Sequence, residues 1–74
     1  MPKLSPESPR TVIQKLRRLG FEGPFGGGKH VFMRHPVTRV KITVPVHQGR
    51  DIPLGTLRAI VREADVSVEE WLNL

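Results

Sequence analysis

The spacing of apolar residues changes twice along the chain, from helical to alternating and back to helical. Residues 9–19 carry apolar side chains three or four positions apart, which is the period of one helix face. Residues 40–44 alternate apolar and polar side chains, as a half-buried strand does. Residues 53–64 return to helical spacing. Because the chain has only 74 residues, these segments can enclose one small core, and we expect a single domain over residues 1–74.

Two further short strands are predicted between the helical segments. Phe21–Phe25 and His30–His35 are separated by three consecutive glycines, which are typical of a flexible turn. Pro24 cannot donate a ladder hydrogen bond, so the first of these strands is expected at a sheet edge or to be irregular. With residues 40–44, these strands predict an α+β fold, in which a three-stranded antiparallel sheet carries helices on one face and leaves the other open.

The ends of the two main helices are marked by residues that favour helix starts and stops. Ser8 suits the N-cap, Pro9 suits the first helical position, and Gly20 suits a left-handed C-terminal residue. Asp51 is a candidate cap for the second helix.

We expect the C-terminal end of the chain to form a short helix and the N-terminal end to be flexible. Residues 67–70, Ser-Val-Glu-Glu, have the form of a capping box and predict a short last helix in which Trp71 fills the core. Residues 1–8 contain two prolines and two serines and predict a flexible arm.

Positive charge is concentrated in the first two thirds of the chain. Residues 1–50 contain ten Lys and Arg and two acidic residues, which gives +8, and residues 51–74 contain two Arg and five acidic residues, which gives −3. Such asymmetry indicates a polyanionic partner, with nucleic acid the first choice. The candidate phosphate contacts are Lys3, Arg10, Lys15, Arg17, Arg18, Lys29, Arg34, Arg39, Lys41 and Arg50.

Composition excludes several classes of protein. The chain has no cysteine, which rules out disulfides, thiolate zinc sites and cysteine nucleophiles. No apolar run approaches the roughly 20 residues of a membrane span, and the first residues lack the apolar region of a signal peptide. We therefore expect a cytoplasmic protein with no membrane partner.

Two motifs have simple structural interpretations. Residues 23–29 fit the Gly-x-x-x-x-Gly-Lys pattern of a phosphate-binding loop, but His30 replaces the Ser or Thr that would hold magnesium, and a strand follows where a helix is required. A glycine hairpin turn is expected instead. His30 and His35 are five positions apart, so they fall on opposite faces of a strand, and we expect no metal site.

The second strand presents a possible reaction surface if Val31 and Met33 face the core. The open face then combines an imidazole, an aromatic ring and cations, contributed by His30, Phe32, Arg34, Lys41 and Thr43. RNA cleavage needs a base for the 2′-hydroxyl, an acid for the leaving oxygen and charge stabilisation at the phosphate. The alternatives are that His30 is an ordinary surface histidine and that Phe32 is a core residue on a strand of the opposite orientation.

Four blocks of the sequence, in order, resemble the HicA-type toxins. They are Leu16–Phe21, Gly28–Pro36, Val44–His47 and Gly55–Ile60, and with their spacing they cover nearly the whole chain. The resemblance implies a double-stranded-RNA-binding-domain-like α-β-β-β-α fold. It also implies a ribosome-independent mRNA endonuclease that arrests translation and growth, and a HicB-type antitoxin, encoded beside it, that covers the active site.

The resemblance also implies roles for individual residues. The catalytic histidine of the family falls on His30, and its preceding glycine falls on Gly28, while Lys29 and Val31 depart from the usual Ser and second His. The expected RNA contacts are Gly28, Lys29, Phe32, Arg34 and Lys41. We expect no metal and no other cofactor, and a free chain that is monomeric.

Three questions stay open at the level of sequence. A second proton-transfer group could be His35, His47 or Lys29. A non-catalytic RNA-binding module of the same fold is an alternative to the nuclease. A protein-interaction domain that docks an acidic partner on its basic face is another.

Overall fold

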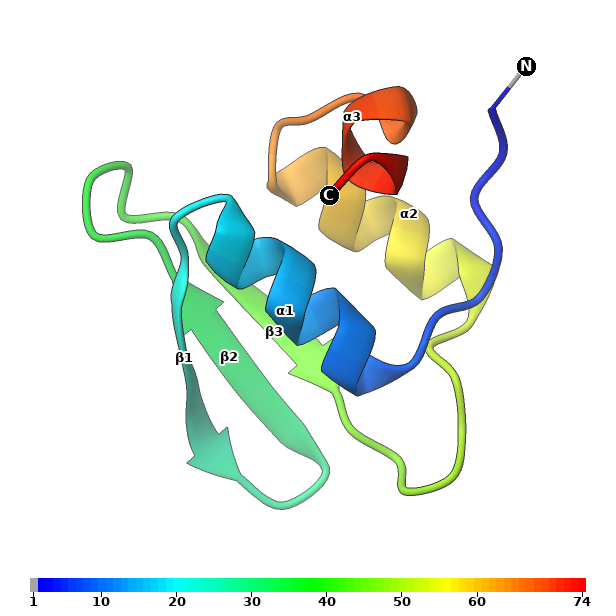
Figure 1. Ribbon diagram of the computed structural model, residues 1–74. Helices are drawn as coiled ribbons and strands as arrows, with labels where there is room; N and C mark the ends of the chain where they lie inside the picture. The colour runs from blue at the N-terminus through cyan, green and yellow to red at the C-terminus, as the bar shows by residue number, and fades with distance from the viewer. Residues whose placement is uncertain (1) are drawn as a thin grey trace.

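The computed structural model describes residues 2–74, and Met1, the first residue of the predicted arm, lies outside the described residues. The elements follow the order α-β-β-β-α-α (Figure 1). Their bounds are α1 Pro9–Arg18, β1 Glu22–Gly27, β2 His30–Arg34, β3 Lys41–Pro45, α2 Leu54–Glu63 and α3 Val68–Leu72. This order confirms the α+β, double-stranded-RNA-binding-domain-like arrangement with a short C-terminal helix.

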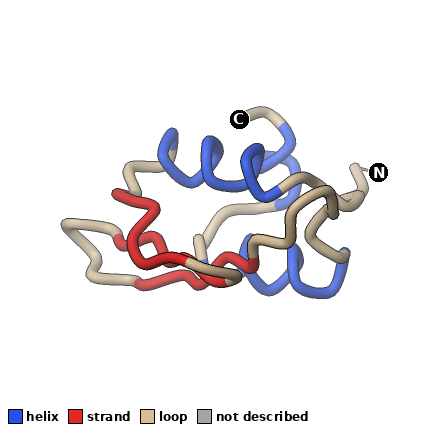
Figure 2. Tube along the Cα trace, turned by 90° about the horizontal axis from the view of Figure 1, so that it is seen from below, coloured by secondary structure: helices blue, strands red, loops and turns tan. Residues whose placement is uncertain are grey.

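The three strands form one antiparallel sheet in the order β1-β2-β3. In β2, Phe32 lies opposite Phe25 of β1 and Thr43 of β3. The register of β1 shifts between Glu22 and Phe25, which confirms the irregular strand expected around Pro24. Figure 2 shows α1 along one face of the sheet. α2 lies next to the sheet and contacts β3. Within residues 2–74 no helix covers the opposite side of the sheet, which is called the open face below (Figure 2).

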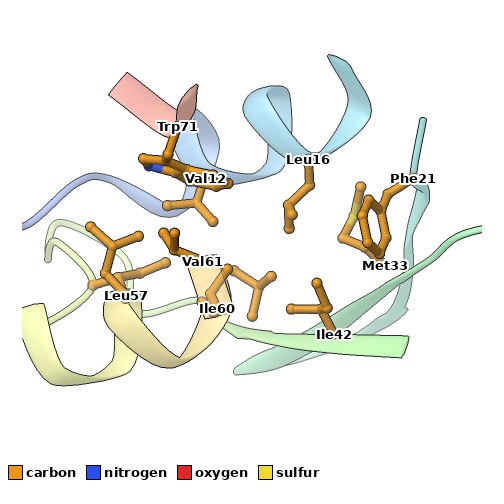
Figure 3. Close-up of a cluster of buried hydrophobic side chains, with 11 residues drawn as sticks. Val12, Leu16, Phe21, Met33, Ile42, Leu57, Ile60, Val61 and Trp71 are labelled. Atoms are coloured by element: carbon orange, nitrogen blue, oxygen red, sulfur yellow. The ribbon is translucent and has the colours of Figure 1, made fainter. Parts of the chain in front are cut away.

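The hydrophobic core lies between α1, α2 and the covered face of the sheet (Figure 3). Its buried members are Val12, Leu16, Phe21, Met33, Ile42, Val44, Ile52, Leu57, Ile60, Val61 and Trp71. The helical and alternating patterns predicted these faces because apolar burial is the main force that orients a surface helix or strand. Trp71 is fully buried, as expected from its place in the last helix.

Most of the predicted helix ends are confirmed. The Ser8 hydroxyl accepts a hydrogen bond from the backbone N–H of Thr11 at 3.2 Å. Gly20 follows α1 with φ +99°, a conformation that favours glycine. Ser67 and Glu70 form the predicted capping box, so that each side chain accepts from the backbone of the other residue.

Two local predictions were wrong. Asp51 does not cap α2, because that helix begins at Leu54 with Pro53 at its N-cap and no side-chain cap. The hairpin turn between β1 and β2 does not include Gly26 and Gly27, which belong to β1. Gly27 already pairs with His30, so the strands close around a two-residue turn at 28–29.

The end of the N-terminal segment is attached to the domain at Glu7. Its carbonyl accepts from the Ile52 N–H at 2.7 Å, and its carboxylate accepts from Trp71 Nε1 at 3.0 Å. Lys15 Nζ lies 3.3 Å from the same carboxylate, and both side chains are only 13% exposed. A carboxylate removed from water needs such partners. Lys15 therefore serves inside the fold and is not one of the free phosphate contacts that its charge suggested.

No helix described for residues 2–74 combines the length and the apolar character needed to cross a lipid bilayer.

Candidate functional site

The alternation along β2 decides which side chains reach the open face. Met33 is fully buried and Val31 packs against the core, whereas His30 and Arg34 are exposed and Phe32 is half-buried. This is the orientation on which the predicted reaction surface depended, and the alternative orientation with Phe32 in the core is wrong. The ladder places Arg34 opposite Lys41, so the two cations stand side by side at one end of the face.

Aromatic rings occupy the middle of the open face. The Phe32 and Phe25 centroids are 5.4 Å apart with a tilt of 37°, and Lys41 Nζ lies 4.3 Å from the Phe32 centroid. Phe25 was not among the predicted site residues, although its place opposite Phe32 in a hairpin is the signal that could have found it. Its ring is 41% exposed. Exposed rings with an adjacent cation suit base stacking and phosphate contact together.

His30 opens β2 directly after the Gly28-Lys29 turn. Gly28 has φ +75°, and a Cβ built on it would meet no atom within 4 Å, so its backbone is open to an approaching group. The His30 ring stands 6.3 Å from the His47 ring, centroid to centroid, with an interplanar angle of 79°. A shallow surface hollow of about 500 Å³ lies beside the His47 ring and is lined by Gly28, Lys29, Val46, His47 and Gln48.

His35 is held away from this surface by structural contacts. Its Nδ1 accepts from the backbone N–H groups of Val37 at 3.2 Å and Thr38 at 3.3 Å. Its ring stands edge-on to the buried Phe21 at 5.1 Å, and its Nε2 lies 2.9 Å from where a Cβ on Gly20 would be. His35 thus shapes the turn after β2 and packs on the side of α1.

We expect His35→Ala to lower the free energy of unfolding by about 1–2 kcal/mol, because two turn hydrogen bonds and an edge contact are lost. His35→Asn should cost about half as much, since the Asn oxygen can accept from the same two N–H groups. Urea unfolding of the three chains measures both effects. Equal stability of His35→Ala and wild type would show that these contacts contribute nothing.

The metal-ligating side chains of residues 2–74 form no group of three. The His30–His47 pair has no Asp or Glu with it in such a group. What the site offers is two imidazoles, the turn backbone, an aromatic pair and cations.

Comparison with known proteins adds the family. The family described as HicA toxin of bacterial toxin-antitoxin matches residues 9–66, which is most of the chain. The chain belongs to the HicA toxin family. The protein is therefore a toxin-family member that works with an antitoxin partner. No curated protein matched the chain.

The HicA match spans every residue predicted for the site, and the fold divides them into two groups. Gly28, Lys29 and His30 gather at the hairpin end of the sheet. Arg34 and Lys41 lie at the other end. The Cα of Arg34 is about 13 Å from that of His30, because a strand rises about 3.3 Å per residue. Phe32 stands between them. The HicA domain therefore presents a continuous row of side chains along the open face, from His30 through Phe32 to Arg34 and Lys41.

Proposed function

We propose that this HicA-family toxin is a metal-independent endonuclease that cleaves mRNA, with His30 as a general acid or base. The observation that carries the proposal is the position of His30. It is exposed, on the open face, between the Gly28–Lys29 turn, where Gly28 borders open space, and the half-buried Phe32 ring. Imidazole can give or take a proton near neutral pH, which is the requirement of this chemistry.

The remaining groups would bind and orient the RNA. A base of a single strand would stack on the Phe25–Phe32 pair, while Arg34 and Lys41 would contact the backbone. Lys29 would hold the phosphate at the hairpin end, and Gly28 would let the backbone approach it. Because side chains supply the proton transfers, no metal and no other cofactor is needed in this scheme.

The proposal also identifies the partner. A HicB-type antitoxin, encoded beside the toxin, would cover the open face and so block access to His30. A basic face favours an acidic covering surface. With mRNA as substrate the toxin would act in the cytoplasm, as a monomer when free. Loss of toxicity on co-expression with the antitoxin tests this part.

Cleavage of RNA without divalent cations tests the enzymatic part. End-labelled single-stranded RNA incubated with the purified toxin in excess EDTA should be cut, and its binding should weaken steeply with salt. A parallel preparation of His30→Ala controls for contaminating ribonuclease. If wild type binds RNA without cleaving it, the proposed nuclease activity is wrong, and the non-catalytic RNA-binding module of the same fold is favoured.

A further inference from the structure

We propose that His47 is the second proton-transfer group, paired with His30 across one phosphoryl group. The inference rests on the proposed RNA cleavage and names the residue that completes it. The two rings come from positions 17 residues apart in the sequence, and the fold brings their centroids to 6.3 Å. This spacing leaves room for a phosphoryl group whose oxygens lie about 2.6–3.2 Å from a nitrogen of each ring.

The backbone on both sides of His47 is held in place. On one side, the Val46 N–H donates to the Lys29 carbonyl at 2.6 Å, which ties the end of β3 to the hairpin turn before His30. On the other side, the His47 carbonyl accepts from the Arg50 N–H at 3.0 Å. In the sheet, Pro45 lies opposite His30. His47 therefore stands next to His30 because of the register of the sheet and of two backbone hydrogen bonds, rather than by chance approach of mobile side chains.

The other two candidates are less suited to the role. His35 lies five residues from His30 along the chain, about 16 Å in an extended strand, and its Nδ1 already accepts two backbone hydrogen bonds. Lys29 belongs to the same turn as Gly28 and lines the hollow beside His47. A lysine side chain has no acceptor while charged, so it serves the phosphate as a cation.

The paired histidines support cleavage by transesterification. One imidazole takes the proton of the 2′-hydroxyl, and O2′ attacks the adjacent phosphorus. The bond from phosphorus to O5′ breaks, and the other imidazolium gives its proton to the leaving O5′. The products are a 2′,3′-cyclic phosphate and a 5′-hydroxyl, with one proton taken up by the first histidine and one released by the second. Lys29 would offset the charge that develops on the phosphoryl oxygens.

A leaving-group substitution tests the pair directly. The cut site of the wild-type toxin is first mapped on an in vitro transcript. Oligonucleotides spanning that site are then made with the natural O5′ and with sulfur in its place, since a thiolate leaves without a general acid. On the natural substrate we expect His30→Ala and His47→Ala each to lose at least 100-fold in rate. On the sulfur substrate one of the two variants, the one that lacks the acid, should recover to within about tenfold of wild type, and the other should not.

The matched control is His35→Asn, which replaces a histidine that follows the other end of β2. It should cleave both substrates as wild type does. The pair is overturned if His47→Ala cleaves the natural substrate at the wild-type rate, or if neither variant or both variants are rescued by sulfur. A wild-type toxin that cuts no RNA would overturn the proposed function itself, and the pair with it, whereas a normal wild type with an active His47→Ala refutes only the pair.

Discussion

Induced expression of His30→Ala should leave growth and total mRNA intact, whereas wild type should stop growth and degrade mRNA. Removing a general acid or base typically costs 100- to 10,000-fold in rate. The His30 side chain is exposed, so its loss should change the free energy of unfolding by less than about 0.5 kcal/mol. The aromatic rings and cations remain in place, and RNA affinity should stay within a few-fold of wild type.

Growth curves and mRNA integrity measured in the same cultures distinguish the possible outcomes. His35→Asn is the matched control, and it should be as toxic as wild type, because that histidine lies on the helix-covered side. A fully toxic His30→Ala would refute the assignment of His30. If wild type itself proves harmless, the non-catalytic RNA-binding module becomes the leading function. Lys29→Ser and Val31→His, which restore the residues usual in the family, are then the first substitutions to test.

The largest loss of stability is expected from Trp71→Ala. Trp71 is fully buried, and replacing a buried Trp or Phe by Ala typically costs about 3–5 kcal/mol. The substitution also removes the indole N–H that donates to Glu7, whose carboxylate is largely buried beside Lys15. Small domains have only about 5–15 kcal/mol of stability in total, with short chains near the lower end. We therefore expect the variant to be largely unfolded at growth temperature.

Circular dichroism with urea titration measures this loss. Leu72→Ala is the control in the same helix, since that side chain is 38% exposed and should cost less than about 1 kcal/mol. Trp71→Phe retains a large ring but loses the N–H and part of the buried indole volume, so its cost should lie between those of Leu72→Ala and Trp71→Ala. Equal midpoints for Trp71→Ala and Leu72→Ala would show that α3 is not part of the cooperative core. That result would be informative, because α3 lies beyond the residues matched by the HicA family.

The elements of the fold could be predicted from local patterns. Apolar spacing placed both main helices and β3 within one or two residues, because the periods of helix and strand differ and only one face of each can be buried. Ser8, Gly20 and Ser67 marked helix ends through hydrogen bonds and backbone angles that involve near neighbours. The prediction failed for Asp51. The residues just before α2 are held by a long-range contact, the hydrogen bond from the Ile52 N–H to the Glu7 carbonyl, which no local pattern shows.

The sequence by itself therefore determined the order of elements and the concentration of positive charge in the first two thirds of the chain. Each depends on periodicity or charge, which can be counted along the chain. Only the tertiary structure decided what lies beside His30. It brought His47 to the site, paired Phe25 with Phe32, fixed His35 in a turn and enclosed Lys15 with Glu7 and Trp71. Those neighbours depend on sheet register and on backbone hydrogen bonds between distant segments, and no local pattern specifies them.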